Sequence, residues 1–293
     1  MNLEWYKVFY AAAQTGSLSK AAEALYITQP AVTHSIKQLE SQLGGQLFFR
    51  TSKGVQLTDE GQVLFKYIEQ AFNFITTGER KLAELHELMT GEIKIGAGDT
   101  LCRHYLLPYL QSFHSAYPDI KIQVTNRTSP ETIQLLKEGK IDLGIINLPA
   151  TDARLKVVES ASLQDCFVAG LRYKQLNGKP LTLGELSGYP LILLEQGSNT
   201  RAYIDGYAAE QGVSLKPEIE LGSNDLLVEF ARTGLGIACV IRNFVQKELN
   251  ATGSDLFEIQ LDRPIPPRKV GIITLKDVPL SSAAKRFIDQ ILA

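Results

Sequence analysis

Residues 16–57 place a short helix, a tight turn and a second helix before a glycine-flanked hairpin. Ser17 can cap the first helix, and the chain must turn at Tyr26. Thr28 can cap the second helix, with Pro30 in its first turn, where a missing N–H costs nothing. The second helix has an apolar seam, formed by Val32, Ile36, Leu39 and Leu43. Its opposite face is polar and consists of Gln29, Pro30, Thr33, His34, Lys37 and Gln38.

This polar face has two interpretations. Its hydrogen-bond donors and small side chains suit a helix that lies in the major groove of DNA. A short amphipathic helix pair is also commonly the outer surface of a helical bundle. The segment that follows favours DNA, because residues 47–50 and 55–57 predict two strands of a hairpin. The expected tip, residues 51–54, places Arg50 and Lys53 where a wing reaches phosphates or the minor groove.

A helix with an apolar stripe precedes these elements and can close a small core with them. Its stripe consists of Trp5, Val8, Phe9 and Ala12. Residues 1–57 therefore predict a winged helix-turn-helix domain.

The run of residues 17–61 carries a family resemblance. It reads SLSKAAEALYITQPAVTHSIKQLESQLGGQLFFRTSKGVQLTDEG and resembles the N-terminal signature of the LysR-type transcriptional regulators. The length of the chain and the order of its segments are also similar to that family. The resemblance implies base contacts by Gln29, Pro30, Thr33 and His34, where the family more often has Ser at the position of Thr33. It implies backbone contacts by Thr28, Lys37, Arg50, Thr51 and Lys53.

Composition limits how such a domain would hold double-stranded DNA. The chain has 293 residues, a net charge of -2 and a pI near 6.1, so it is not broadly basic. Residues 1–57 hold five Lys or Arg against three Glu. We therefore expect a few placed contacts rather than a broad electrostatic coating. The N-terminus lacks a leader pattern and no apolar stretch approaches the roughly 18 residues of a membrane span, which predicts a cytoplasmic protein without membrane contact.

Residues 58–90 predict one long helix, capped by Thr58 and ended near Gly91. Its apolar residues advance by alternating steps of four and three, which is a heptad seam. A helix of about 32 residues is roughly 48 Å long, too long to bury its stripe against residues 1–57 alone. We expect a homodimer or a dimer of dimers; the alternative is packing against the chain's own C-terminal domain. The seam consists of Leu64, Ile68, Ala71, Ile75, Gly78, Leu82, Leu85 and Met89.

Residues 91–293 alternate strand and helix patterns, which predicts a parallel α/β fold in two lobes. The chain is expected to cross between the lobes near residues 159–163 and 265–268. The expected lobes are 91–161 with 268–293 (lobe I) and 162–267 (lobe II). The family resemblance implies a periplasmic-binding-protein-like (type 2) effector domain with its ligand cleft between the lobes.

Hydroxyl residues stand where several predicted strands lead into helices. Hydroxyls and backbone N–H groups at these positive helix ends suit a small anion, particularly a carboxylate. Capping is the simpler role for each hydroxyl taken alone. The resemblance implies a pocket lined by Thr100, Ser129, Asn147, Ser198, Asn199 and Thr200, with Ser223 and Asn224 as weaker candidates.

Charged residues near these positions would tune the ligand. Asp99 immediately precedes Thr100 and favours a small-molecule effector that also offers hydrogen-bond donors. Arg103, Arg127 and Arg268 would supply countercharge, although exposed arginines are more common.

Two other classes of function compete with a regulator. One is an enzyme on the same two-lobed fold, with Cys102, His104 or Asp142 as catalytic groups; the other is a small-molecule carrier. Cys102 and His104 are two apart on a helix and point to different sides, and Asp142 is expected to pack inside a strand. The three cysteines lack metal-ligand spacing and are expected to be thiols, with redox sensing by Cys102 as a minor alternative. We expect no catalysis, no metal and no cofactor.

Overall fold

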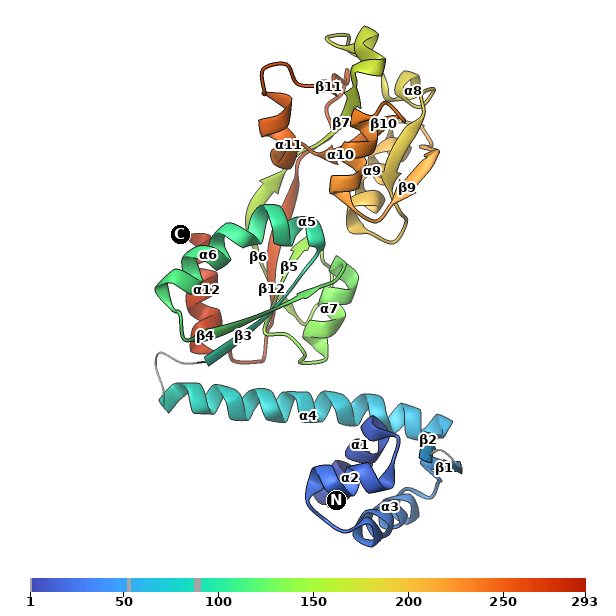
Figure 1. Cartoon of the computed structure of the whole chain (residues 1–293), viewed down its shortest axis with the longest axis vertical. Helices are drawn as coiled ribbons and strands as arrows, with labels where there is room; N and C mark the ends of the chain where they lie inside the picture. The colour runs from blue at the N-terminus through green and yellow to red at the C-terminus, as the bar shows by residue number, and fades with distance from the viewer. Residues whose placement is uncertain (1, 52–53, 87–90) are drawn as a thin grey trace. The chain divides into compact units, whose positions relative to one another are not determined.

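A computed structural model describes residues 2–51, 54–86 and 91–293, and in residues 83–86 the backbone only (Figure 1). The chain divides into two compact units, residues 1–80 and 81–293, which are described separately below. In the part that is described, no helix is both long enough and apolar enough to cross a membrane. The expected domain limits at residues 57/58 and 90/91 stay a prediction.

The N-terminal unit follows the expected order of helices and hairpin. Its elements are α1 (Leu3–Thr15), α2 (Leu18–Leu25), α3 (Gln29–Leu43), β1 (Phe48–Thr51), β2 (Gly54–Leu57) and the first part of α4 (Asp59–His86). Ser17 caps α2 by accepting from the Lys20 N–H, and Thr28 caps α3 by accepting from the Ala31 N–H. Between the two helices, Tyr26 adopts the left-handed conformation that makes the turn tight.

The core of this unit joins the three helices and the hairpin. Phe9, Val32 and Leu39 are fully buried, and the rings of Phe9 and Phe48 are 5.3 Å apart between centroids. Two expectations need correction. Leu43 does not continue the buried seam, because it is 46% exposed at the last residue of α3. Thr51 belongs to β1 rather than to the tip, and Lys53 lies outside the described residues.

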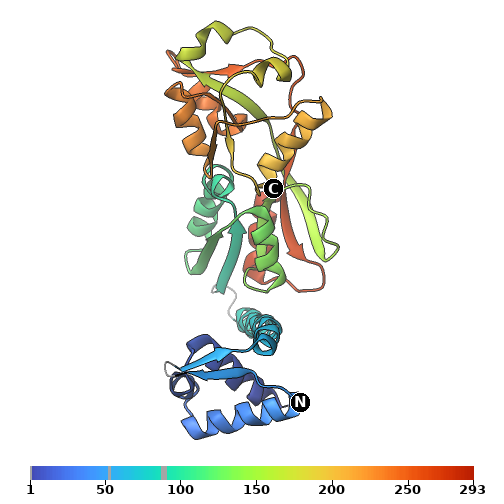
Figure 2. The same cartoon turned by 90° about the vertical axis from the view of Figure 1, so that its right-hand side faces the viewer.

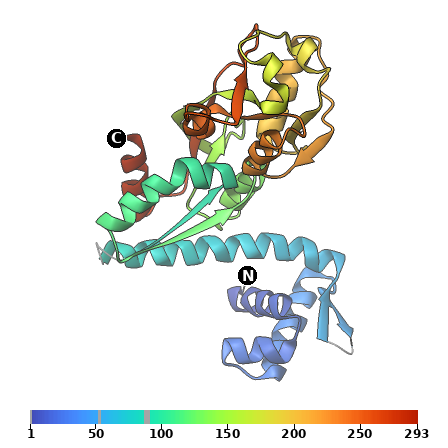
Figure 3. The ribbon, with the colours of Figure 1, turned by 45° about the horizontal axis from the view of Figure 1, so that its top comes forward.

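Helix α4 is long and straight in outline (Figure 3). Its apolar seam divides into a first part that is packed and a second part that is exposed. Leu64 and Ile68, expected to face a partner helix, instead pack against the core of the N-terminal unit. Phe65 and Phe72 pack there too and stack on Tyr10 at 5.7 and 5.2 Å between ring centroids. Further along the seam, Ala71, Ile75, Gly78 and Leu82 are exposed. The expectation for the Leu85 side chain and for Met89 lies outside what is described.

The C-terminal unit contains two lobes, each built on a five-stranded sheet (Figure 2). The first sheet has the order β4-β3-β5-β12-β6, with strands β3 (Gly91–Ala97), β4 (Ile120–Asn126), β5 (Leu143–Asn147), β6 (Leu155–Leu163) and β12 (Arg268–Leu275). The second has the order β9-β8-β10-β7-β11, with strands β7 (Asp165–Gly170), β8 (Leu191–Leu194), β9 (Ile219–Leu221), β10 (Ile237–Ile241) and β11 (Leu256–Ile259). The two lobes therefore repeat one topology.

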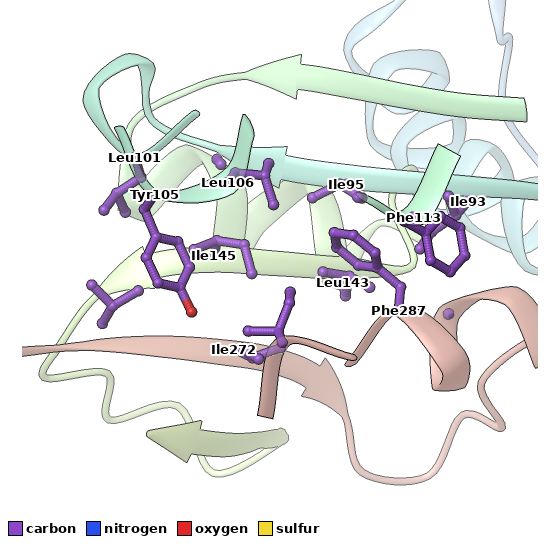
Figure 4. Packing of buried hydrophobic residues seen from close by; sticks show 14 of the residues in the cluster. Ile93, Ile95, Leu101, Tyr105, Leu106, Phe113, Leu143, Ile145, Ile272 and Phe287 are labelled. Carbon is purple, nitrogen blue, oxygen red and sulfur yellow. The ribbon is translucent and has the colours of Figure 1, made fainter. Parts of the chain in front are cut away.

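Helices cover both faces of each sheet, which explains the nearly continuous apolar character of the central strands. On the first sheet, α6 (Leu107–Ala116) and α12 (Ser282–Leu292) lie on one face and α7 (Ser129–Lys137) on the other. Phe113 and Phe287 meet edge to face at 5.1 Å between centroids (Figure 4). On the second sheet, α8 (Leu183–Leu186) and α9 (Asn199–Glu210) lie opposite α10 (Asn224–Arg232) and α11 (Arg242–Leu249).

One helical segment leads from the first strand of lobe I into α6 in three steps. The short α5 (Asp99–Leu101) is followed by a π-helical turn, Cys102–Leu106, and then by α6. A π turn holds one more residue than an α turn and is common at functional sites. Lobe II has a 3₁₀ segment, Leu171–Leu176, after β7.

Several expectations for the C-terminal unit were wrong in detail. The sheets are mixed rather than parallel: in each, three strands are parallel and the remaining two are antiparallel to their neighbours. Residues 159–163 do not cross between the lobes, because β6 pairs with β12 as far as Leu163 opposite Arg268. The first crossing falls at Gln164. The second lies where it was expected, between Ile265, which packs in the core of lobe II, and Arg268, where β12 of lobe I begins.

Candidate functional site

The start of α3 presents polar side chains to the outside of the N-terminal unit. Thr28, Gln29, Pro30 and His34 are exposed, and Thr33 is half-buried. Gln29 Nε2 lies 3.4 Å from Thr33 Oγ1, within hydrogen-bond distance. Hydroxyl, amide and imidazole groups thus share one exposed turn of helix, which is the chemistry that reads base edges.

A groove of about 380 Å³ separates α3 from the hairpin. Thr33 and Lys37 line it from α3, and Phe49 and Arg50 line it from β1. Thr51 is exposed on the same strand, and its hydroxyl donates to the Gly54 carbonyl at 3.1 Å. Three of the predicted DNA-contacting residues, Thr33, Lys37 and Arg50, therefore line one groove between α3 and the wing.

Two aromatic residues of this unit are exposed although no role was predicted for their rings. Tyr26 is 96% exposed and has a φ of 55°, and Phe49 is 56% exposed. Phe49 lies in a short strand of mixed pattern, where a large aromatic residue is usually assigned to the core, and the turn at Tyr26 does not by itself predict how exposed its ring is.

A second candidate site lies between the lobes of the C-terminal unit. The parallel strands of both sheets end at a cavity of about 210 Å³, where ligands bind in open α/β sheets. Lobe I contributes Gly98, Asp99, Thr100, Leu101, Thr128, Ser129 and Asn147. Lobe II contributes Leu194, Glu195, Gln196, Gly197, Ser198, Asn199, Thr200, Gly222, Asn224 and Ile241.

The structure brings most of the predicted effector residues to this cavity. Thr100, Ser129, Asn147, Ser198, Asn199 and Thr200 all line it. Ser223 does not line it; the following residue, Asn224, does so instead. A strand-to-helix position predicts that a residue lies near the cavity, but not which of two neighbours turns toward it.

The three arginines expected to supply countercharge do not line the cavity. Arg103 pairs with Asp225, and Arg127 is exposed and donates to the carbonyl of its neighbour Asn126 at 2.7 Å. Arg268 is buried and pairs with Asp165. The expected countercharge is absent because Arg103 and Arg268 form ion pairs with acidic residues that are far away in the sequence.

Two buried hydroxyls line the cavity with unused hydrogen-bonding capacity. Ser129, which is 7% exposed, accepts from the Asn147 N–H at 3.2 Å, and its own O–H donates to none of the described residues. Thr200, which is 8% exposed, makes no side-chain hydrogen bond with the described part of the chain. Ser198 differs, because it caps α9 by accepting from the Arg201 N–H at 3.1 Å. Buried polar groups are normally paired, so Ser129 and Thr200 are the hydroxyls available to a ligand.

Direct contacts join the lobes around the cavity. Asn199 Nδ2 donates to the Asn147 carbonyl at 3.0 Å, and Asn224 Nδ2 donates to Thr100 Oγ1 at 2.8 Å. On the π-helical turn, His104 Nε2 lies 3.2 Å from Asp225 Oδ1, and its ring stacks on Phe244 at 4.6 Å between centroids. The π turn thus positions its side chains against the first turn of α10.

A buried ion pair joins the two lobes where the chain crosses between them. Arg268, the first residue of β12, forms a bidentate pair with Asp165, the first residue of β7, with Nη2 and Oδ1 2.9 Å apart. Arg268 also donates through Nη1 to the Asn147 side chain. This guanidinium therefore holds both crossing strands and one residue of the cavity.

The side chains considered for an enzyme lie in separate environments. The Cys102 thiol donates to the Ala97 carbonyl at 3.5 Å, while His104 contacts Asp225. Asp142 accepts from the Lys94 backbone N–H at 2.8 Å. Burial, together with the nearby Asp99 carboxylate, raises the pKa of Cys102 to about 11. Burial also raises the pKa of Cys166 and Cys239, so all three cysteines are thiols at neutral pH.

Comparison with known protein families identifies the two domains that contain these sites. Residues 3–62 match the bacterial regulatory helix-turn-helix protein domain of the lysR family. Residues 86–293 match the LysR substrate binding domain. The chain belongs to the LysR family of transcriptional regulators. The winged helix-turn-helix is its DNA-binding part, and the two-lobed unit is its substrate-binding domain.

Two named regulators illustrate this LysR-family relationship. The transcriptional activator CmpR of Synechocystis sp. is 26% identical over 292 residues, which is 100% of this chain and 95% of that protein. The RuBisCO operon transcriptional regulator of Allochromatium vinosum is 28% identical over 256 residues, covering 85% of this chain and 82% of that protein.

Solved structures of other LysR-family regulators have the same fold. Full-length OxyR from Pseudomonas aeruginosa superposes with a TM-score of 0.72 at 20% identity, covering 99% of this chain and 94% of that one. Full-length CbnR in complex with its target DNA superposes with a TM-score of 0.69 at 18% identity, covering 99% of both chains.

Proposed function

We propose that this LysR-family regulator recognises a specific DNA sequence with the start of α3 and contacts the DNA backbone with the wing. The exposed polar turn of α3 supports this role, because its groups differ in donor and acceptor character and can distinguish base pairs. The base-contacting set comprises Gln29, Pro30, Thr33 and His34. The backbone-contacting set comprises Thr28, Lys37, Arg50, Thr51 and Lys53, the last outside the described residues.

The regulator binds DNA as a homodimer, or as a dimer of dimers, joined through the exposed part of α4. Ile75 and Leu82 support this proposal, because they are 41% and 60% exposed on one heptad seam. A two-fold axis through this seam would present two reading heads to a two-fold-related site. We place the protein in the cytoplasm, where its target DNA lies.

The inter-lobe cavity takes a small metabolite that carries a carboxylate or another small anionic group. One observation carries this part of the proposal: Ser129 and Thr200, from opposite lobes, present buried hydroxyls to the cavity beside the starts of α7 and α9. Helix starts carry N–H groups without intrahelical partners and a partial positive charge, both of which favour an anion.

Ligand binding changes how the two lobes close, and through this how dimers assemble on DNA. A ligand that contacts both lobes favours the arrangement in which both sets of contacts are made. The expected result is a changed spacing or bend of the bound DNA. A ligand that changes transcription without changing footprint length or DNA bend angle would contradict this mechanism.

The DNA-reading role is tested by Thr33→Ala, with Ser41→Ala as its matched control. Both changes remove a hydroxyl from α3, but Ser41 lies far from its N-terminal turns. We expect Thr33→Ala to weaken binding to the protein's own upstream DNA by about 1–3 kcal/mol and to leave binding to random DNA nearly unchanged. Gel-shift titrations at several salt concentrations measure both. An equal loss on random DNA would remove Thr33 from the base contacts.

The effector role is tested by Ser129→Ala, with Ser282→Ala as control. Each serine is the first residue of a helix, α7 and α12 respectively, but Ser282 does not line the cavity. Thermal-shift titration with small organic acids should give a reduced response in Ser129→Ala and a normal one in Ser282→Ala. DNA affinity without added acid should not change in either variant. A normal titration of Ser129→Ala would exclude Ser129 from the binding site.

A further inference from the structure

The charged groups of the inter-lobe cavity are all acidic. Asp99 lines it from lobe I and Glu195 from lobe II. Asp99 accepts a hydrogen bond from Asn126 Nδ2 at 3.0 Å, which leaves its charge without a cation. Glu195 lies over Gly222, where a Cβ would be 3.1 Å from its Oε1, so the absence of a side chain makes room for this carboxylate.

None of the residues lining the cavity is Lys, Arg or His. Three nearby arginines are held by acidic residues outside the cavity: Arg103 by Asp225, Arg268 by Asp165, and Arg201 by Asp205 and Glu220. A fourth, Arg127, is exposed and donates to the Asn126 carbonyl rather than lining the cavity. Within the described residues, neither Asp99 nor Glu195 forms an ion pair. The cavity therefore offers two carboxylates to a ligand without a cation of its own.

The same cavity also offers strong hydrogen-bond donors. Ser129 and Thr200 are each more than nine-tenths buried as residues, and their hydroxyl groups have no described acceptor. The first N–H groups of α9 lie beside Thr200 and point along the helix toward its start. These donors need an acceptor, preferably an anionic one, because a buried donor left unpaired is costly. A simple cation would leave them unpaired, and a simple anion would leave Asp99 and Glu195 uncompensated.

We propose that the effector is a small zwitterion of the α-amino-acid type. This inference rests on the proposed function and narrows the ligand of the same cavity. The ligand carboxylate contacts Ser129, Thr200 and the start of α9, and the ligand ammonium group is held by Asp99 and Glu195. Each charged end is contacted by one residue from each lobe, so the ligand joins the lobes at both ends.

The size of the cavity agrees with this class of ligand. Its volume of about 210 Å³ is below the roughly 300–1,000 Å³ of pockets for drug-sized molecules. Larger hollows of about 370 and 470 Å³ occur elsewhere in the C-terminal unit, one under residues 258–265 and one beside α9. Neither combines carboxylates from both lobes with buried unpaired hydroxyls.

Three sets of compounds on matched carbon skeletons test the charge requirement with the full-length protein. The sets are the common α-amino acids, the corresponding 2-hydroxy acids, which lack the ammonium group, and the corresponding amines, which lack the carboxylate. Thermal shift identifies binders and calorimetry measures their affinity. We expect at least one amino acid to bind, and its hydroxy acid and amine to bind about 10- to 100-fold more weakly, since each lacks one charge-assisted set of hydrogen bonds.

Asp99→Asn and Glu195→Gln separate ammonium binding from a structural role. Each change keeps the shape of the side chain and removes its charge; Asp119→Asn, at an exposed position outside the cavity, is the control. Each cavity variant should lose about 10- to 100-fold in affinity for the amino acid and should gain affinity for the matched hydroxy acid. A structural defect would weaken both ligands together.

The possible results distinguish the inference from the proposed function. If hydroxy acids bind wild-type protein as tightly as amino acids, the cavity takes simple anions, so the proposed function stands and the zwitterion is wrong. If no compound of the three sets binds protein that still shifts its upstream DNA, the zwitterion is wrong and the DNA-reading role is unaffected. If the protein binds neither ligand nor DNA specifically, both proposals fail.

Discussion

The Arg268–Asp165 pair offers a quantitative test of what holds the two lobes together. Both side chains are almost completely buried, Arg268 at 2% and Asp165 at 0% side-chain exposure. Replacing Arg268 with Met keeps most of the apolar stem and removes the guanidinium. The Asp165 carboxylate is then buried without a cation, and the Asn147 side chain loses its donor.

The expected cost follows from this geometry. Removing one partner of a buried ion pair typically costs about 3–5 kcal/mol, mostly because the remaining charge is left uncompensated. In a unit of this size, a loss of about 1 kcal/mol lowers the melting temperature by about 2–4 °C, so Arg268→Met should lower it by about 6–20 °C. Replacing both residues, Arg268→Met with Asp165→Leu, should recover most of the loss because no buried charge remains.

The chain contains an internal control for this measurement. Trp5 is the single tryptophan and lies in the N-terminal unit. Its fluorescence follows unfolding of that unit, while far-ultraviolet circular dichroism also follows the C-terminal unit. We expect the midpoint temperature of the Trp5 fluorescence transition to be unchanged by Arg268→Met. The circular-dichroism transition that reports the C-terminal unit should move to a lower temperature. A loss below about 1 kcal/mol for Arg268→Met, or a double variant no more stable than the single one, would refute the reasoning.

Three further predictions concern separate features. Tyr26→Gly should stabilise the N-terminal unit by up to about 1 kcal/mol in Trp5-monitored urea unfolding, because Tyr26 pays for a left-handed backbone without burying its ring; a loss of stability would show that the ring packs. Leu82→Glu should shift the sedimentation coefficient toward the monomer by placing a charge on the exposed seam, and unchanged sedimentation would place the dimer contact elsewhere. Cys102 should be alkylated by iodoacetamide about 100-fold more slowly at pH 7 than a thiol of pKa 9.0, with the rate rising until the pH approaches 11; fast alkylation at pH 7 would contradict this.

Local signals predicted much of this fold because many of its elements begin with their own capping residue. Ser17 and Thr28 each cap a helix that was expected after them. Helix α11 was missed because it begins directly after β10, with Ile241 at the N-cap and no side-chain cap.

Features that depend on partners far away in sequence were beyond local patterns. Strand β6 has a mixed pattern of exposure and lies at a sheet edge, so neither alternation nor a continuous apolar run marks it. The roles of Arg103 and Arg268 depend on Asp225 and Asp165, which no spacing rule connects to them. Cavity residues were easier to predict, because in an α/β lobe the ends of parallel strands meet at one edge wherever the rest of the chain runs.

The π-helical turn at Cys102–Leu106 separates the orientation of the residues before it from the orientation of the residues after it. Its extra residue rotates what precedes it by about 100° relative to an uninterrupted α-helix. Thr100 can therefore point into the cavity while Phe113, further along, stays in the core. Insertion or loss of one residue in this turn would change which side chains of α5 face the cavity. The packing of α6 in the core would stay the same. Such a change offers evolution a short route to a new ligand preference without a new fold.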